Sequence, residues 1–302
     1  MNMSSNEELP FVSVVVPVYN GENYIAKNIE SLLAQEYPKE KYEILIIDNG
    51  STDATNTIAA AYPVTRIEES KARNSYVARN RGIAVAKGSI LAFTDADCVA
   101  KPDWISRGIA RVSQEQGGIV GGKIEFLFSE KKTSAELLDS LINLNNELFI
   151  TLRHSAQTAN VFIPKTLFTE LGLFPDTAVS GGDALWTNNA WKGGKSLVYD
   201  ASVVVFHPTR NCKELLEKHF RVGRGCVAVW QGRGKNVFWI SARIASLFLP
   251  ILAFRLPGLI TKWGRKDISY PLIKMMGVSY LCTLANVSGI AATFYRSLFR
   301  KS

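Results

Sequence analysis

A chain of 302 residues has room for one large domain with an accessory segment, or for two modest domains. Its 47% hydrophobic residues supply a sizeable core, and 21% charged residues exclude wholesale disorder. The formal net charge of +8 fits an anionic membrane surface, a phosphate-bearing substrate or nucleic acid. Because no block of consecutive basic residues with interleaved aromatics occurs, no nucleic-acid partner is expected.

Residues 1–10 are polar and acidic, and they lack the basic start and apolar stretch of a signal peptide. We expect them to form a flexible N-terminus. The four cysteines lie far apart without paired spacing, which favours a reduced setting over a disulfide framework or a zinc site. The catalytic part is therefore expected to be cytoplasmic.

Strand and helix patterns alternate through the first hundred residues. Short apolar runs predict strands at Val12–Pro17, Tyr42–Asp48, Val64–Ile67 and Ser89–Thr94. Helical spacing and caps predict helices at Gly21–Glu36, Ala54–Ala61 and Ser75–Lys87, and a further helix after Pro102. This alternation predicts an α/β fold, a Rossmann-like and mostly parallel sheet flanked by helices.

The pattern continues less regularly. Strands are expected at Gly117–Phe128, at 157–164 and at Ser202–Phe206, and helices at Thr133–Arg153, Gly181–Trp191 and Glu214–Trp230. Glycine and charge interrupt the pattern at Gly232–Lys235. We therefore expect a catalytic domain over residues 11–231 and a membrane-associating helical segment over 232–302.

The C-terminal segment contains two apolar runs. The uncharged stretch Ile244–Phe254 is too short for a bilayer, which needs about 20 residues, whereas Met275–Tyr295 is long enough. Basic residues flank both runs, so charge gives no orientation, and insertion into the interface beside membrane lipids explains both as well as spanning does. A pair of buried soluble helices or an oligomer interface is the alternative.

Polar side chains follow the predicted strands where ligands of open α/β sheets bind. Asp95 and Asp97 come directly after one strand, and two carboxylates this close favour a divalent cation, Mn²⁺ or Mg²⁺, shared with substrate phosphates. A solvated turn that caps the next helix is the alternative. Asp48 ends another strand and is a candidate to accept a hydrogen bond from a nucleobase, or is only a polar strand end.

Three further residues are candidates for chemistry. Arg79 lies on a predicted helix and can hold phosphate oxygens with its planar guanidinium, or simply meet water. Asp183 follows two glycines at a helix start, where it can take the proton of an acceptor hydroxyl or only cap the helix. His207 follows a strand and is a candidate metal ligand or diphosphate donor, or a packing residue.

Five stretches in order and in register resemble glycosyltransferase family 2, whose members have the GT-A fold. The stretches are Val14–Asn20, Ile46–Asp53, Ala78–Ile83 with Ala86–Gly88, Phe93–Asp97 and Gly172–Pro175 together with Asn160. The resemblance covers residues 11–230. It implies an inverting transfer of a sugar from a nucleotide-diphosphate sugar.

The resemblance also implies roles for single residues. Asp183 falls where the family has its catalytic base, and Asp97 where it binds metal, whereas His207 is a metal candidate from its own position alone. The donor-binding residues implied are Pro17, Tyr19, Asn20, Glu22, Asp48, Arg79, Asp95 and Ala96. The family often has Glu-Asp at the catalytic base, whereas this chain has Gly182-Asp183, a difference that concerns acceptor recognition more than chemistry.

The expected enzyme builds a polysaccharide or glycolipid at the cytosolic face of a membrane, with a glycan or lipid-linked acceptor. Transfer to a polyprenyl phosphate is an alternative within the same chemistry. A catalytically silent membrane scaffold with the same fold is an alternative from another class.

Overall fold

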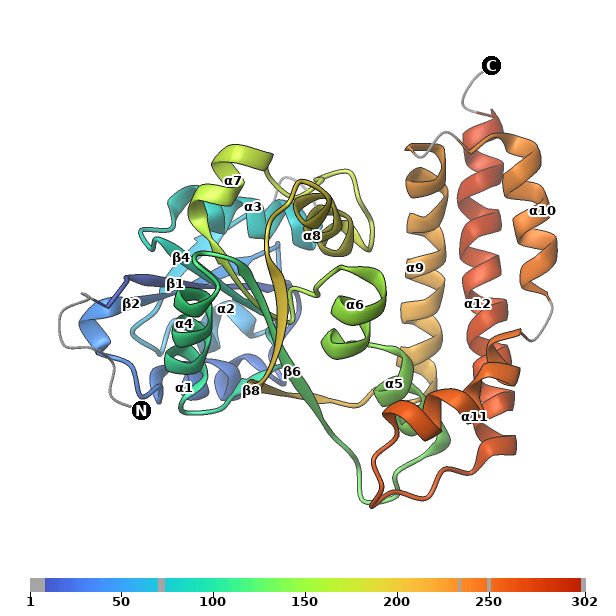
Figure 1. The fold of residues 1–302 in the computed structure, drawn as a ribbon, viewed down its shortest axis with the longest axis horizontal. Helices are drawn as coiled ribbons and strands as arrows, with labels where there is room; N and C mark the ends of the chain where they lie inside the picture. The colour runs from blue at the N-terminus through green and yellow to red at the C-terminus, as the bar shows by residue number, and fades with distance from the viewer. Residues whose placement is uncertain (1–8, 70–73, 233–234, 249–250, 300–302) are drawn as a thin grey trace. The chain divides into compact units, whose positions relative to one another are not determined.

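The protein is described by a computed structural model that covers residues 9–69, 74–232, 235–248 and 251–299 (Figure 1). The predicted flexible N-terminus therefore lies, up to residue 8, outside the described residues. The chain packs as two compact units. The first, called the sheet unit, comprises Met1–Glu125, Asn146–Asp176 and Asp183–His207, and the second, called the helical unit, comprises Phe126–Asn145, Thr177–Gly182 and Pro208–Ser302.

One mixed sheet organises the sheet unit, with strand order β3-β2-β1-β4-β7-β6-β8-β5. The strands are β1 (Val12–Val18), β2 (Tyr42–Asp48), β3 (Thr65–Glu68), β4 (Ile90–Thr94), β5 (Val99–Ala100), β6 (Ile119–Leu127), β7 (Asn160–Pro164) and β8 (Leu197–Pro208). Strands β3, β2, β1 and β4 run parallel, as the alternation of strands and helices predicted. Strand β7 is antiparallel to β4 and β6, and β5 is antiparallel to β8, so the second half of the sheet departs from the parallel pattern.

Helices flank this sheet in the sheet unit (Figure 1). They are α1 (Ile25–Leu33), the 3₁₀ turn η1 (Lys39–Lys41), α2 (Thr55–Ala59), α3 (Ser75–Val85), α4 (Trp104–Gln114), α6 (Asn146–Arg153), α7 (Lys165–Leu171) and α8 (Gly182–Lys192). Helix α3 packs against β1 and β2. Gly82 permits this approach, because a Cβ there would lie 2.5 Å from Cγ1 of Val15. The sheet therefore holds α3 close behind its first two strands.

The single long helix expected at Thr133–Arg153 was wrong, because two helices form there, α5 (Ser134–Ile142) and α6. Asn143 ends α5 in an extended conformation, and Leu144 has a left-handed φ of +48°. Asn146 then donates its buried side-chain amide to the carbonyl oxygens of Gly122 and Asn160. A continuous apolar periodicity did not reveal this break, because a few backbone torsions and one buried amide determine it.

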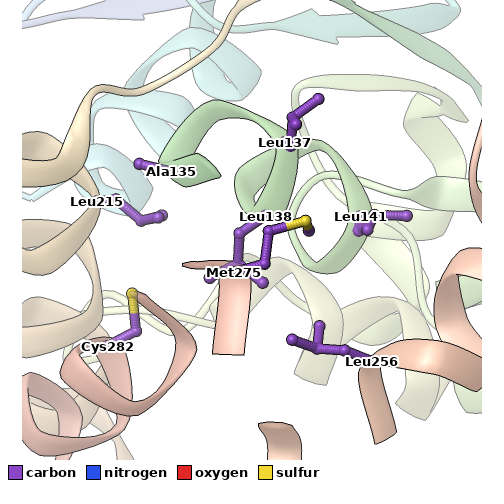
Figure 2. Packing of buried hydrophobic residues seen from close by; sticks show 8 residues of the cluster. All are labelled: Ala135, Leu137, Leu138, Leu141, Leu215, Leu256, Met275 and Cys282. Carbon is purple, nitrogen blue, oxygen red and sulfur yellow. The ribbon is translucent and has the colours of Figure 1, made fainter. Parts of the chain in front are cut away.

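The helical unit consists of α5 with α9 (Cys212–Gly232), α10 (Val237–Leu247), α11 (Ile251–Trp263) and α12 (Leu272–Phe299). Its core combines α5, α9, α11 and α12 (Figure 2), through Ala135, Leu137, Leu138, Leu141, Leu215, Leu256, Met275 and Cys282. Gly223 lies in the middle of α9, where a Cβ would come within 2.0 Å of the carbonyl oxygen of Asn286 on α12. The glycine that weakens the helical pattern thus allows close packing of α9 on α12.

Two buried carboxylates on α5 hold the chain just after β8. Glu136 accepts hydrogen bonds from the backbone N–H groups of Ser129 and Thr133, at 2.8 and 2.7 Å, and from the hydroxyl of Thr209 at 2.9 Å. Asp139 is fully buried and lies 3.3 Å from the guanidinium of Arg210. These contacts fix the first residues of the segment that leads from β8 into α9.

Helix α12 is the one helix among the described residues with the length and composition needed to cross a membrane. Within Leu272–Tyr295, an 18-residue window has a mean hydropathy of 1.4, and 33% of that window is buried within the protein. The expected apolar helical tail is confirmed in that sense. The expected domain limits at residues 10 and 231 stay predictions, and residues 233–234 of the expected boundary lie outside the described part.

Candidate active site

The parallel strands bring their carboxyl ends to one edge of the sheet. In register, Val18 at the end of β1 pairs with Asp48 at the end of β2, and β1 also pairs in parallel with β4. Tyr19, which follows β1, is 43% exposed at this edge, whereas Pro17 is buried within β1. The topology therefore gathers the polar residues that follow separate strands.

Asp48 is nearly buried, with 3% of its surface exposed. Its carboxylate accepts hydrogen bonds from the backbone N–H of Ser51, at 3.2 and 3.3 Å, and from the side-chain amide of Asn56 at 2.8 Å. A carboxylate offers about four acceptor positions, so these two donor groups leave capacity for a ligand N–H. The loop after β2 thus orients Asp48 at the edge of the sheet.

Asn20 and Glu22, both expected to bind donor, connect the loops after β1 and β2. The side-chain oxygen of Asn20 accepts from the N–H of Thr52 at 2.9 Å, and that of Glu22 accepts from the N–H of Ala54 at 3.0 Å. Asp53 accepts in return from the N–H of Glu22 at 3.1 Å. In this conformation these side chains position the loops around Asp48.

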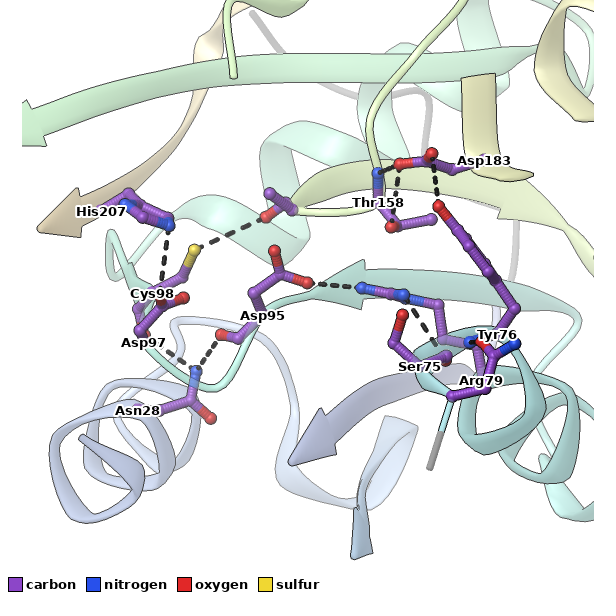
Figure 3. Close-up of polar contacts among 12 residues, drawn as sticks. Asn28, Ser75, Tyr76, Arg79, Asp95, Asp97, Cys98, Thr158, Asp183 and His207 are labelled. Atoms are coloured by element: carbon purple, nitrogen blue, oxygen red, sulfur yellow. Dashed lines mark hydrogen bonds and ion pairs between the residues drawn. The ribbon is translucent and has the colours of Figure 1, made fainter. Parts of the chain in front are cut away.

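The turn after β4 carries an acidic corner made of Asp95, Ala96 and Asp97. The Asp95 carboxylate lies 2.5 Å from the Arg79 guanidinium, whose residue is only 5% exposed (Figure 3). Asn28 on α1 donates its amide to the carbonyl oxygens of Asp95, at 3.2 Å, and of Cys98, at 2.8 Å. The ion pair and the amide together fix the corner from two different helices.

The remaining acidic side chain of the corner, Asp97, faces His207. The antiparallel pairing of Val99 on β5 with Phe206 on β8 brings His207 to the corner, where its Nε2 lies 3.2 Å from Oδ2 of Asp97. His207 is 1% exposed and the Asp97 side chain 31%. The strand register thus unites two residues that are 110 positions apart in the sequence.

This pair fits a divalent cation. Neighbouring ligands of one octahedral ion lie about 3 Å apart, because each metal–ligand bond is about 2.0–2.2 Å long. The 3.2 Å between the Asp97 oxygen and the His207 nitrogen is close to that separation. No group of three or more His, Cys, Asp or Glu side chains suited to a metal occurs in the part of the chain that is described. A metal here would therefore complete its coordination with substrate phosphate and water.

Asp183 lies in the first turn of α8, after a turn in which Gly181 has a φ of +77°. Its Oδ1 accepts from the hydroxyl of Tyr76 at 3.0 Å and from the N–H of Ala184 at 2.9 Å. Its Oδ2 accepts from the N–H and the hydroxyl of Thr158, at 3.1 and 3.2 Å (Figure 3). Asp183 therefore has hydrogen-bonding partners on α3 and on the segment before β7, besides the N–H of its own neighbour.

Sequence reasoning missed Tyr76 and Thr158 as neighbours of Asp183. For Tyr76 a signal was present, because it lies three residues before Arg79 and so on the same face of α3. The sequence carries no comparable signal for Thr158, since its contact depends on how β7 and α8 pack. Burial, with a further contribution from the charge of Asp183, raises the pKa of Tyr76, so this phenol remains a donor.

A cluster of aromatic rings supports α8 behind Asp183. Trp186, less than one turn further along the helix, stacks on Phe168 with ring centres 4.6 Å apart, and its indole N–H donates to the carbonyl oxygen of Gly172 at 2.7 Å. Phe174 lies against Trp186 and also 6.1 Å from the ring of Tyr76. Such aromatic packing limits rotation of Trp186 and Tyr76, the two side chains that define the position of Asp183.

A mixed α/β sheet with acidic groups at the carboxyl edge of its parallel strands is the architecture of the GT-A glycosyltransferases. Solved structures agree in fold. A mannosyltransferase from Pyrobaculum calidifontis, determined with GDP-Man and Mn²⁺, is 19% identical, with a TM-score of 0.57 over 98% of this chain and 76% of that one. TarS 1–349 of S. aureus with UDP-GlcNAc is 17% identical, with a TM-score of 0.55 over 95% of this chain and 92% of that one.

Sequence comparison gives the family itself. The model described as glycosyl transferase family 2 matches residues 13–165. Glycosyltransferase AglE of Haloferax volcanii is 36% identical over 297 residues, which are 96% of this chain and 98% of that protein. The chain belongs to glycosyltransferase family 2, and the resemblance seen in its motifs is confirmed.

Proposed function

We propose that this glycosyltransferase moves a sugar, with inversion, from a nucleotide-diphosphate sugar to a hydroxyl group of a polysaccharide or glycolipid. The observation that carries the proposal is the joint anchoring of two carboxylates by α3. Tyr76 contacts Asp183, and Arg79, one turn later, contacts Asp95. The helix thus ties the residue at the family's base position to the acidic corner at the donor side.

Donor binding is assigned to the edge formed by β1, β2 and β4. Asp48 accepts an N–H of the nucleobase, and Pro17 and Tyr19 border the base and ribose. Asp95 and Ala96 meet the ribose or the donor sugar, with Arg79 holding Asp95 in place. The remaining acceptor capacity of Asp48 supports this assignment. Asn20 and Glu22 contribute by shaping the loops that enclose the donor.

Asp97 and His207 would hold a divalent cation, either Mn²⁺ or Mg²⁺. Their 3.2 Å separation supports this assignment, and so does the Mn²⁺ of the P. calidifontis enzyme. When bound, the ion offsets the negative charge that develops on the departing diphosphate. Arg79 adds positive charge beside the corner, although its side chain is buried.

The chemical step needs one base. Oδ2 of Asp183 takes the proton of the acceptor hydroxyl, and the electron pair of that O–H bond forms the new bond to the anomeric carbon. The carbon–oxygen bond to the diphosphate breaks on the opposite face, and its electron pair leaves with the nucleotide. The transition state has oxocarbenium character, as in glycoside hydrolysis, and positioning of the two substrates supplies much of the acceleration.

Membrane lipids are the proposed partner of the helical segment, with catalysis at the cytoplasmic face. Large apolar side chains project outward, with Phe238 85%, Phe254 72% and Ile273 85% exposed. Exposed basic residues accompany them, namely Arg243, Arg255, Lys262, Lys266 and Lys274. Apolar side chains flanked by cations suit the boundary between acyl chains and anionic headgroups.

The test is a thermal-shift screen of the full-length chain in detergent with GDP-mannose, UDP-N-acetylglucosamine and other nucleotide-sugars, with and without Mn²⁺. A donor at 100 times its Kd stabilises the folded state by about 2.7 kcal/mol, which is readily measured. Donors that stabilise are then offered to a panel of methyl glycosides. Stabilisation by one donor that grows with Mn²⁺, followed by transfer, supports the proposal. Transfer that is unchanged by EDTA would remove the metal assignment.

A further inference from the structure

Helix α3 presents two side chains to two different carboxylates. Tyr76 donates its hydroxyl to Oδ1 of Asp183 at 3.0 Å, and Arg79 lies 2.5 Å from Oδ1 of Asp95 (Figure 3). The guanidinium carbon of Arg79 also lies 5.6 Å from the centre of the Tyr76 ring. Tyr76 therefore lies between the residue proposed as base and the arginine of the acidic corner.

The hydroxyl of Tyr76 has little freedom to leave Asp183. The residue is 5% exposed, and its ring lies 6.1 Å from that of Phe174, which packs in turn on Trp186. Burial and the nearby charge of Asp183 raise the pKa of the phenol, so it stays protonated and donating. Of the contacts described for Asp183, Tyr76 is titratable, whereas Thr158 and the N–H of Ala184 are neutral. Arg79, beside the Tyr76 ring, is the charged group.

The acceptor positions of Asp183 are full. A carboxylate has about four of them. Tyr76 and the N–H of Ala184 use two on Oδ1, and the N–H and hydroxyl of Thr158 use two on Oδ2. A substrate hydroxyl can therefore bond to this carboxylate only where one donor departs. The two backbone N–H groups cannot move without the backbone, and the ring of Tyr76 is fixed by its packing against other aromatic rings.

The hydroxyl of Thr158 is the donor able to depart. Its contact, at 3.2 Å, is the longest of the four, and its O–H turns about a single bond while the backbone stays in place. We propose that Tyr76 is the positioning residue that holds the base of this enzyme. The hydroxyl of Thr158 occupies the position on Oδ2 of Asp183 that the acceptor hydroxyl takes, and it breaks its hydrogen bond when the acceptor binds. The proposal rests on Asp183 being the base of the proposed function.

The two donors then have different kinetic signatures. The pH profile of kcat reports the pKa of the base in the substrate complex, and that of kcat/KM reports it in the free enzyme. A hydrogen bond to a carboxylate favours its ionised form, so removing a donor is expected to move the acidic limb of a profile to higher pH. Tyr76 acts in both states, whereas the Thr158 hydroxyl acts only before the acceptor binds.

The experiment measures kcat and kcat/KM for a methyl glycoside acceptor from pH 5 to 9, with the full-length enzyme in detergent and the donor found in the screen. Tyr76→Phe keeps the ring and removes only the oxygen. We expect its acidic limb to move up by about one unit in both profiles, with kcat about tenfold lower and the donor KM within about twofold. Thr158→Val is expected to move the limb of kcat/KM alone.

Tyr62→Phe is the matched control, because Tyr62 also donates to a carboxylate, Glu30 at 2.8 Å, but on the surface. Its profiles should match those of the unmodified enzyme. A Tyr76→Phe enzyme with unchanged kcat and pH profile would remove the positioning role. A Thr158→Val enzyme whose kcat limb moves, or whose kcat/KM limb stays, would remove the yielding hydroxyl.

Asp183→Asn, measured alongside, separates these failures from failure of the base assignment. If Asp183→Asn retains transfer, the base and everything argued from it fall together. If it abolishes transfer while Tyr76→Phe behaves as the unmodified enzyme, only the role of Tyr76 falls. Should Tyr76→Phe fail to bind donor in the thermal-shift assay, a Thr158→Val profile shifted in kcat/KM but not in kcat supports the proposal, and any other profile overturns it.

Discussion

Replacing Asp183 with asparagine is the most direct test of the site, and the structure gives two separate consequences. The change keeps the shape of the side chain but removes the charge that would take the proton. General-base catalysis contributes about 10²–10⁴ in rate, so we expect kcat to fall by at least about 100-fold. Donor binding should persist, because the corner at Asp95 keeps its contacts with Arg79 and Asn28.

The second consequence is a loss of stability. Each oxygen of Asp183 accepts from one backbone N–H, that of Ala184 on Oδ1 and that of Thr158 on Oδ2. Whichever way an asparagine amide turns, its NH₂ group faces one of these N–H groups. A buried donor left without its acceptor costs about 1–3 kcal/mol. At about 2 kcal/mol, Tm should fall by roughly 4–8 °C, given about 2–4 °C per kcal/mol for a domain of this size.

The assay pairs transfer to a methyl glycoside with thermal melting in the presence of donor. Asp176→Asn is the matched control, because it makes the same chemical change at an exposed side chain outside the hydrogen bonds of Asp183. It should melt and turn over like the unmodified enzyme. An Asp183→Asn enzyme that still shows the donor-induced shift but no transfer isolates the chemistry from folding.

Retention of more than about a tenth of kcat would refute the reasoning. It would mean that a group other than Asp183 takes the proton of the acceptor hydroxyl. A polyprenyl phosphate, by contrast, arrives already ionised, because its second pKa is near 6, and transfer to phosphate needs no base. Activity of Asp183→Asn with a short-chain polyprenyl phosphate, but not with methyl glycosides, would identify that acceptor class as the true one.

Three further predictions test the metal pair, the α5 carboxylate and the core. Asp97→Asn should weaken Mn²⁺ binding, measured by electron paramagnetic resonance, by at least about 100-fold. Asp103→Asn is the control, and equal Mn²⁺ affinities of the two variants would contradict the assignment. Although burial opposes it, hydrogen bonds lower the pKa of Glu136 from 4.5 to about 2, so its contribution is present above pH 4.5 and is lost as pH falls towards 2. Glu136→Gln should cost about 3 kcal/mol at pH 7 and less than half of that at pH 3 in urea unfolding; a penalty that does not change with pH would refute the cause. Gly108→Ala would place a Cβ 2.4 Å from the Phe162 ring and should destabilise the folded protein by about 1–3 kcal/mol in thermal melts. Phe162→Leu should partly restore the stability, and an unchanged Tm of Gly108→Ala would contradict the predicted clash.

The sequence predicted the first half of the sheet closely, because each strand there is a local signal. The predicted strand from Tyr42 to Asp48, built around the apolar run Ile44–Ile47, matches β2 in both bounds. Parallel strands covered on both faces need such runs, so periodicity alone locates them. The same logic predicted that Asp48 and Asp95 follow strands of one edge, as the register shows.

The antiparallel half was less accessible to sequence reasoning. The two-residue strand β5 and the helix α7 were missed, since neither is long enough to produce a periodic pattern. The break between α5 and α6 depends on the left-handed Leu144 and on the buried amide of Asn146. Long-range contacts of this kind leave no trace in a window of ten or fifteen residues.

The sequence by itself determined which residue types are available for chemistry: carboxylates after apolar strands, an arginine one turn along a helix, and an aspartate after two glycines. These follow from local periodicity and from motifs in fixed order. Only the tertiary structure decided which of them meet. Strand register brought His207 to Asp97, and packing of α3 and α8 on aromatic rings brought Tyr76 to Asp183. Contacts between residues about a hundred positions apart depend on the packed core, and no local pattern encodes them.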